Sequence, residues 1–385
     1  MLDTRFSEVC EAAAAAWSVP ALAVGVSVGD ASETLALGCS PETRFLIASV
    51  TKPFTAALAL SVLGLDEGVG VWPEDVRVRH VLSHTSGFDC ELPDGDTARF
   101  GQGDEALGAL VAELPSVPRL TGSDDIWSYA NTGYWLAGWL AAERAGASYE
   151  DALAERVLEP AGLEATSFAE PDLEGTGEEL PPPPYPRARR PSGGLTSNAG
   201  DLLRFGRWLL SAPVFREMAV AVGRPIGMVY GYGLFGEQVG GAGIWKHDGS
   251  YGGFQSSFLL VPEREAVFVG LTNSSLGTKA LRQIEDEFFR RVVGEPRAPR
   301  VHRKLAPEEY ARFAGVYENG DGRHEVLYPD ASDGVVLVEE GVEYIGLALD
   351  ERTFEIAVGE RLGDRFDFPR DGFGRFGSRL ARRVS

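Results

Sequence analysis

The sequence predicts an α+β protein in two parts. The first is an antiparallel sheet flanked by helices, with an inserted helical subdomain, and the second is a small, barrel-like all-β domain. Three observations lead to this prediction. Helical and strand-like segments open the chain, and a long helical stretch occupies its middle. Strand-like segments return from about residue 226. From residue 306 onward, short strand-like runs are punctuated by glycine and aromatic residues, as in small closed sheets.

The N-terminal half is dominated by helical patterns around one early pair of strands. Alanine and glutamate in residues 4–17 indicate a helix, and small and β-branched residues at 21–28 and 34–37 indicate strands joined by a turn. Residues 170–192, rich in glutamate and then proline, are expected to form a linker-like segment, because proline ends helices and interrupts sheets. Further helices are expected at 49–63, 78–83, 104–113, 132–145 and 198–210.

The C-terminal half carries the remaining strands and a closing helix. A long amphipathic pattern at 279–293 predicts this helix. Short β-branched or aromatic runs predict strands at 228–235, 243–247, 253–261 and 266–272. We expect a first domain at 1–295, with its helical insertion at about 66–225, then a linker at 296–305 and a small β domain at 306–385.

The charge balance excludes two classes of partner. The chain has 36 basic and 57 acidic residues, which gives a formal net charge of −21. Because phosphate binding needs clustered lysine and arginine, no nucleic acid partner is expected. The same charge disfavours anionic membrane surfaces, and no apolar run is long enough for a transmembrane helix. The N-terminal residues lack the pattern of a secretory signal, so a cytoplasmic location is expected.

Several short patterns that can bind cofactors or metals lack the context that such sites need. Residues 372–377 match Gly-x-Gly-x-x-Gly, but no helical pattern follows them. His80 and His84 have the i, i+4 spacing of metal ligands without a third ligand in view. The three cysteines include no Cys-x-x-Cys pair and are too scattered for a disulfide framework. We expect neither a metal nor an organic cofactor.

A candidate nucleophile and base occur in Ser49-Val50-Thr51-Lys52. If a helix begins near Ser49, residue i+3 lies on the same face, and the Lys52 amine approaches the Ser49 hydroxyl. Serine becomes an effective nucleophile when a base takes its proton, and lysine can be that base when burial makes its neutral form accessible. The alternative is a serine that caps a helix, with an exposed lysine beside it.

A second candidate group is Tyr129-Ala130-Asn131, just before a predicted helix. Tyr129 could act as a phenolate base or as a proton relay to a leaving group. The amide of Asn131 could hold a substrate carbonyl. The alternative is a buried tyrosine beside an asparagine that caps the following helix.

A third candidate group, His247-Asp248-Gly249-Ser250, is expected at the end of a strand. A glycine there would let a substrate approach the backbone, and the N–H group of the next residue could point at an oxyanion. The alternative is a glycine-rich turn with an incidental histidine.

The three groups, in this order, resemble the serine β-lactamase and penicillin-binding-protein superfamily. The likeness is greatest to the branch of class C β-lactamases, D,D-peptidases, D-aminopeptidases and family VIII esterases. It rests on Ser-x-x-Lys at 49–52, Tyr-x-Asn at 129–131 and a basic-x-Gly triplet at 247–249, with supporting segments at 81–87 and 193–197. The resemblance spans about residues 5–293 and implies a β-lactamase-like fold there. The C-terminal part is more loosely similar to the extra domains of some D-aminopeptidases and esterases.

This resemblance implies an acyl-enzyme mechanism that needs no metal or organic cofactor. Ser49 would attack a carbonyl, with Lys52 and Tyr129 handling its proton. The backbone N–H groups of Ser49 and Ser250 would form the oxyanion hole, and Asn131 would orient the acyl group. Tyr129 would pass a proton to the leaving group and then help to activate water.

The third group departs from the Lys-Thr-Gly that β-lactamases of this branch usually carry, and Asp248 is the informative difference. Its carboxylate would repel the carboxylate of a β-lactam or a D,D-peptidase substrate, unless it points away and pairs with an arginine such as Arg187 or Arg190. We therefore expect an esterase or amidase for small neutral acyl esters or amides. The alternatives are a D-aminopeptidase in which Asp248 meets the substrate's amine, a weak β-lactamase, and a catalytically silent binding protein.

The C-terminal domain is expected either to cover the cleft and exclude large substrates or to mediate self-association into a homo-oligomer. The expected partner is a small-molecule ester, amide or β-lactam. Four arginines form a basic tail that is expected to be solvated or docked on the protein itself: Arg375, Arg379, Arg382 and Arg383.

Overall fold

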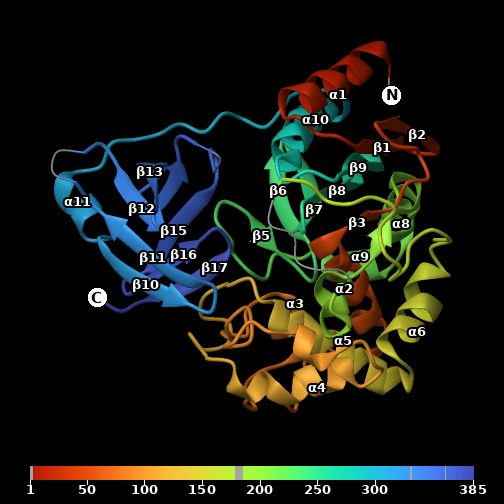
Figure 1. The fold of residues 1–385 in the computed structure, drawn as a ribbon, viewed down its shortest axis with the longest axis horizontal. Coiled ribbons are helices and arrows are strands. Elements are labelled where there is room, and N and C mark those ends of the chain that lie inside the picture. The colour runs from red at the N-terminus through yellow and green to blue at the C-terminus, as the bar shows by residue number, and fades with distance from the viewer. Residues whose placement is uncertain (1–2, 178–184, 330–331, 360) are drawn as a thin grey trace.

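The computed structural model describes residues 3–177, 185–329, 332–359 and 361–385. It contains an antiparallel sheet in the order β2-β1-β9-β8-β7-β6-β5, a two-stranded ribbon and a closed barrel of β10 to β17. Figure 1 shows the barrel beside the sheet and a group of helices packed at one end. The α+β class with a C-terminal barrel is confirmed. Part of the linker-like segment predicted at 170–192, residues 178–184, lies outside the described residues.

The strands of the main sheet come from two distant stretches of chain. β8 and β9 are buried along their whole lengths, because helices cover both of their faces. The N-terminal hairpin of β1 and β2 joins the sheet where β1 pairs with β9. The strands are β1 (Leu22–Val28), β2 (Ala31–Leu37), β5 (Val229–Tyr230), β6 (Phe235–Val239), β7 (Ala242–Tyr251), β8 (Phe254–Val261) and β9 (Ala266–Thr272).

Two helices cover one face of the sheet and two others pack against the opposite face. α1 (Thr4–Ala16) and α10 (Gly277–Val292) lie together on the first face, as Figure 1 shows. α2 (Thr51–Val62) and α8 (Ala199–Ser211) pack against the second. The α8 helix packs closely because it has Gly206 toward the sheet, where an added Cβ would lie 2.5 Å from Val267.

The remaining helices form the group at one end of the sheet, beneath α2. A short ribbon of β3 (Phe45–Leu46) and β4 (Thr196–Ser197) connects this group to the start of α2. The helices are α3 (Val78–Leu82), α4 (Ala106–Glu113), α5 (Asn131–Ala145), α6 (Tyr149–Leu153), α7 (Arg190–Gly193) and α9 (Val214–Met218), with a π-helical turn at Ala154–Leu158 after α6.

The barrel has its own core of aromatic and branched residues, including Tyr310, Phe354 and Phe368. Each strand pairs with the next, and β10 closes on β17. Its elements are α11 (Pro307–Ala311), β10 (Gly315–Asn319), β11 (Gly322–Leu327), β12 (Val335–Glu339), β13 (Val342–Ala348), β14 (Thr353–Ile356), β15 (Arg365–Arg370), β16 (Phe373–Phe376) and β17 (Arg379–Arg383).

Several sequence-based expectations about elements are wrong. The end of the segment expected to be linker-like at 170–192 is helical, because a 3₁₀ turn at Arg187–Arg189 leads into α7. The strand expected at 228–235 is two strands, because β5 ends at Tyr230 and a turn with Gly233 at φ 86° separates it from β6. Strand and turn alone were expected after residue 306, but α11 is a helix. Proline occupies its first turn, and the Glu309 side chain accepts a hydrogen bond from the Ala306 N–H group at 2.7 Å.

Candidate active site

Ser49 lies in a short 3₁₀ turn, Ala48–Val50, that leads directly into α2. The segment before it is fixed to the β3–β4 ribbon, since the Ile47 N–H group donates to the Leu195 carbonyl at 2.9 Å. Ala48 has a φ of 44°, a left-handed conformation that side chains disfavour and that recurs at functional sites. Ser49 is half-buried between buried neighbours, so this turn presents its hydroxyl to the cleft.

Lys52 is fully buried, and its amine lies against the serine. Nζ is 3.1 Å from Ser49 Oγ and 2.7 Å from the carbonyl oxygen of Ser192. Burial lowers the pKa of Lys52 well below its ordinary value, because the charged amine is poorly solvated there. The neutral amine, which can accept a proton, is thereby made more accessible. The alternative of an exposed lysine beside a capping serine is wrong.

Tyr129 approaches the same two residues from the loop before α5. The Lys52 amine lies 4.7 Å from the centre of the Tyr129 ring. Burial raises the pKa of Tyr129 well above its ordinary value, and a hydrogen bond with Ser49 opposes that rise. The phenol is therefore protonated near neutral pH. This favours a relay that donates and accepts protons over a standing phenolate base.

His84 holds the Tyr129 loop in place. Its Nδ1 accepts a hydrogen bond from the Ala130 N–H group at 3.1 Å, and its carbonyl accepts one from the Ser128 N–H group at 3.0 Å. The imidazole lies 4.4 Å from the Tyr129 ring, and burial lowers its pKa well below the ordinary value. The sequence analysis placed His84 in an i, i+4 histidine pair and in the supporting segment 81–87 without a role of its own, so its contact with the Tyr129 loop was missed.

Asn131 is the first residue of α5, but its side chain does not cap the helix. Its Nδ2 donates to Glu91 Oε1 at 2.6 Å, and the same carboxylate lies 3.4 Å from Arg189 and 3.9 Å from Arg379. The capping alternative is therefore wrong. Asn131 is not among the residues that line the cavity at Ser49, and its expected role in orienting the acyl group stays a prediction.

The His247 group lies inside a strand and not beyond its end. The strand expected at 243–247 is too short, because β7 continues through Gly249 to Tyr251. His247 Nδ1 donates to the Asp248 carbonyl at 2.7 Å, which leaves Nε2 as an acceptor with no partner among the described residues. Burial, with the nearby Lys52 charge, lowers the pKa of His247 to about 3, so the imidazole is neutral at physiological pH.

Gly249 lets β7 lie directly against the Ser49 turn. An added Cβ would lie 2.3 Å from the Ile47 carbonyl oxygen, 2.3 Å from Ser256 Oγ and 3.1 Å from the Ser49 backbone nitrogen. The glycine was expected to make room for a substrate. It makes room first for the backbone of the Ala48–Val50 turn that carries Ser49. This close approach brings the adjacent Ser250 into the same cavity.

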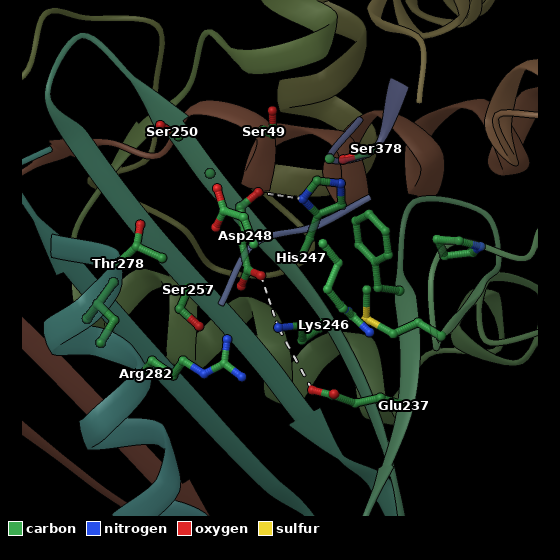
Figure 2. A pocket seen from close by; sticks show the side chains of 18 of the residues that line it. Ser49, Glu237, Lys246, His247, Asp248, Ser250, Ser257, Thr278, Arg282 and Ser378 are labelled. Carbon is green, nitrogen blue, oxygen red and sulfur yellow. Dashed lines mark hydrogen bonds and ion pairs between the residues drawn. The ribbon is translucent and has the colours of Figure 1, made fainter. Parts of the chain in front are cut away.

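Asp248 has a partner that the sequence reading did not consider. Its carboxylate lies 3.0 Å from Lys246 Nζ, on the same face of β7, and its side chain is 54% exposed (Figure 2). Pairing with Arg187 or Arg190 is wrong, because both arginines bind Glu150. A positive charge therefore accompanies Asp248 in the cleft.

The turn between β16 and β17 lies against the Tyr129 loop. The Ser378 carbonyl accepts a hydrogen bond from the Tyr129 N–H group at 2.9 Å, and the Leu380 N–H group donates to Ser128 Oγ at 3.0 Å. Arg375 is buried, pairs with Asp367 and donates to the Trp127 carbonyl at 3.1 Å. Arg375 is therefore docked on the protein, whereas Arg382 and Arg383 at the end of the tail are exposed, and the barrel helps to hold the Tyr129 loop.

A cavity of about 530 Å³ opens over Ser49 and Tyr129 and extends along β7 to α10 and the barrel. Figure 2 shows Ser49, His247 and Ser378 at one end and Arg282 at the other. No group of three or more His, Cys, Asp or Glu side chains in the described part of the chain is arranged to hold a metal ion. His80 lies 2.9 Å from Asp124, which accounts for the other half of the histidine pair.

Comparisons with known proteins identify the family of this chain. The profile of the Beta-lactamase family matches residues 8–287. Penicillin-binding protein 4 of Amycolatopsis lactamdurans is 28% identical over 369 aligned residues, which cover 79% of this chain and 94% of the relative.

Solved structures share the fold over different lengths. The crystal structure of SurE with D-Leu has a TM-score of 0.78 at 23% identity, covers 99% of both chains, and therefore includes the barrel. A D-stereospecific amidohydrolase from Streptomyces sp. has a TM-score of 0.59 at 24% identity and covers 72% of this chain and 97% of its own. Within the described residues, no helix is long and apolar enough to cross a membrane. The family match and the shared architecture together place this chain in the Beta-lactamase family of hydrolases.

Proposed function

We propose that this chain hydrolyses amides and esters through an acyl-enzyme on Ser49. One observation carries the proposal. The hydroxyl of Ser49 lies 3.1 Å from the amine of a completely buried lysine, so a nucleophile and a base with a lowered pKa are already in contact.

In the acylation step, the neutral Lys52 amine takes the Ser49 proton as Oγ attacks the substrate carbonyl carbon. The carbonyl electron pair moves to its oxygen, where the N–H groups of Ser49 and Ser250 would stabilise the negative charge. When the tetrahedral intermediate collapses, the bond to the leaving group breaks. The proton held by Lys52 reaches the leaving group through the Tyr129 hydroxyl, which explains why a protonated tyrosine is useful here.

In the deacylation step, a water molecule attacks the acyl carbon and the same groups run in reverse. The water gives up its proton toward Tyr129 and Lys52, and Ser49 Oγ leaves with a proton. His247 contributes a neutral imidazole whose Nε2 can accept a hydrogen bond from the substrate or the water, since Nδ1 is committed to the Asp248 carbonyl.

The site should accept a wider range of substrates than the neutral ones expected from Asp248 alone. The expectation of neutral substrates depended on an unpaired Asp248 that repels carboxylates. The contact with Lys246 offsets that charge locally. We therefore include substrates with a carboxylate among the amides and esters that the site accepts.

A second candidate is hydrolysis of D-amino-acyl amides or peptides. Two structural neighbours favour it: SurE, which spans this whole fold, was crystallised with D-Leu, and another neighbour is a D-stereospecific amidohydrolase. Asp248, which is exposed to the cleft, could meet the free amine of such a substrate.

Turnover of three chromogenic substrates tests the proposal. p-Nitrophenyl butyrate, D-alanyl p-nitroanilide and the cephalosporin nitrocefin are compared on the purified protein, on Ser49→Ala and on Lys52→Arg. Ester or anilide cleavage that disappears in Ser49→Ala supports the proposal, and the preferred substrate separates its two forms. Fast nitrocefin turnover would make the chain a β-lactamase. Cleavage that survives in Ser49→Ala, or a Ser49 that a fluorophosphonate does not label, would contradict the proposed nucleophile.

A further inference from the structure

The cavity continues well beyond the nucleophile. Past Lys246 it is bounded by α10 on one side and by the barrel on the other, and its lining there includes Thr278, Arg282, Arg300 and Arg365. Figure 2 shows the Arg282 side chain at the end of the view opposite Ser49, beside Lys246 and Ser257. The acyl-enzyme mechanism uses none of these residues.

The acidic side chains that line this part of the cavity are already engaged. Glu285 lies 2.6 Å from Arg297 and accepts a hydrogen bond from Ser257 Oγ at 2.5 Å. Glu237 lies 3.4 Å from Arg297 and 3.8 Å from Lys246. Asp248 is paired with Lys246, and Asp364 lies 3.0 Å from Arg361. Each acidic side chain of the lining is therefore in direct contact with a cation other than Arg282 or Arg365.

Two guanidinium groups in the lining form no direct ion pair among the described residues. Neither Arg282, on α10, nor Arg365, on β15, has a side-chain hydrogen bond or ion pair within the described residues. Arg282 is exposed in the cavity and Arg365 is half-buried. Burial and the neighbouring Arg300 lower the pKa of Arg365 to about 10, although the charge of Glu237 opposes this shift. A half-buried guanidinium that has no direct ion pair and lies near other cations favours the binding of an anion.

We infer that Arg282 and Arg365 bind an anionic group of the substrate, a carboxylate or a similar oxyanion, at the end of the cleft away from Ser49. Guanidinium groups hold carboxylates through paired, charge-assisted hydrogen bonds. The two arginines belong to the sheet-covering helix and to the barrel, so the site exists only where these parts meet. In a chain with a net charge of −21, this local excess of positive charge would select anionic substrates at the cleft itself.

This inference rests on the proposed function, so its test compares matched substrates that differ in charge. On the acyl side, the p-nitrophenyl monoester of suberic acid is paired with its methyl-capped ester. On the leaving-group side, 3-(butyryloxy)benzoate is paired with 3-(butyryloxy)benzamide. The readout is the ratio of kcat/KM for the charged and the neutral member of each pair. It is measured for the wild type, Arg282→Gln, Arg365→Gln, the double variant and Arg216→Gln.

In at least one pair, the wild type should prefer the charged substrate. That preference should fall about tenfold in each single variant and further in the double variant, because each change removes a charge-assisted contact. Added salt should also lower the preference. Arg216→Gln, which removes an exposed arginine outside the cavity, should keep the wild-type ratio. The pair that responds identifies the side of the scissile bond. Ratios that are the same in the double variant and the wild type for both pairs would overturn the inference.

A binding measurement keeps this test separate from the proposed function. Calorimetry with suberate and with 3-hydroxybenzoate on Ser49→Ala, with and without the two arginine substitutions, needs no turnover. If no ester is cleaved but one of these anions binds, and binds at least tenfold more weakly without the arginines, the anion site stands and the proposed reaction fails. Equal or absent binding in the two proteins, together with unchanged ratios or no turnover, would remove the site.

Discussion

In the proposed mechanism, the pKa of Lys52 sets the pH range in which Ser49 can act. Below the pKa of the buried amine, Lys52 is protonated and cannot take the Ser49 proton, so activity is lost as the pH falls through that pKa. Because burial lowers the pKa well below 10.5, this acid limb should lie far below that value. The measurement is kcat/KM for p-nitrophenyl butyrate as a function of pH.

Replacing the same lysine tests its role as a base. Lys52→Arg keeps a cation, but a guanidinium stays protonated, so we expect a loss of at least about a hundredfold in kcat/KM. Lys304→Arg is the control, since Lys304 is 72% exposed and pairs with Asp333 away from the cleft. A Lys52→Arg variant within a few fold of the wild type would show that another group accepts the proton.

Replacing Gly249 tests whether the reactivity of Ser49 requires the contact between β7 and the Ala48–Val50 turn. In Gly249→Ala, the new Cβ would meet the Ile47 carbonyl and Ser256 Oγ at 2.3 Å, so β7 must shift away from Ser49. We expect a stability loss of about 1–3 kcal/mol and a larger loss of fluorophosphonate labelling at Ser49. Gly122→Ala is the matched control, because no atom lies within 4 Å of its added Cβ. Normal labelling in Gly249→Ala would contradict the close packing.

Short-range sequence patterns were enough to predict that the candidate residues lie together, and not enough to identify their partners. Ser49 and Lys52 are three apart, so helical geometry alone brings them together. Lys246 and Asp248 are two apart on a strand, so the same kind of argument would have paired them. Ending the predicted strand at His247, before the glycine, hid that contact.

At the scale of elements, the β16–β17 hairpin is part of the Tyr129 support. Arg375 is 4% exposed, pairs with Asp367 and donates to the Trp127 and Arg224 carbonyls. Its removal leaves the Asp367 carboxylate buried without its partner. We expect Arg375→Ala to cost about 3–5 kcal/mol of stability.

Arg375→Ala should also lower activity, because the Trp127 carbonyl, two residues before Tyr129, loses the hydrogen bond that Arg375 donates to it. Thermal unfolding and kcat/KM for p-nitrophenyl butyrate are measured below the transition temperature. Arg323→Ala, an exposed barrel arginine without a side-chain partner among the described residues, should stay within about 0.5 kcal/mol of the wild type. Loss of stability in Arg375→Ala with unchanged kcat/KM would show that the hairpin supports the fold and not the site.

These barrel contacts could not be read from the sequence. The fold class, most helices and the three motifs depend on local periodicity and spacing, which the chain displays openly. Ser378 and Tyr129 are far apart in the chain, and their contact depends on how a closed barrel docks on a helical group. From the sequence alone, the arginines near the C-terminus are equally consistent with a solvated tail and with a docked one, because no local pattern specifies a buried partner such as Asp367.

At the scale of the whole molecule, the barrel and the part that carries Ser49 should unfold together. All seven tryptophans lie before residue 246, so their fluorescence reports mainly the part that carries Ser49, with Trp127 also sensing its contact with Arg375, whereas far-UV circular dichroism reports both parts. The two parts share buried contacts, among them the hydrogen bond of 2.7 Å from the Gly320 N–H group to the Asp89 carboxylate. Urea unfolding followed by the two signals should therefore give coincident transitions in the wild type. In Arg375→Ala, which loosens the barrel, the circular dichroism transition should begin at lower urea than the fluorescence transition. Separate transitions already in the wild type would mean that the barrel docks too weakly to position Tyr129, and the site would then have to be explained without it.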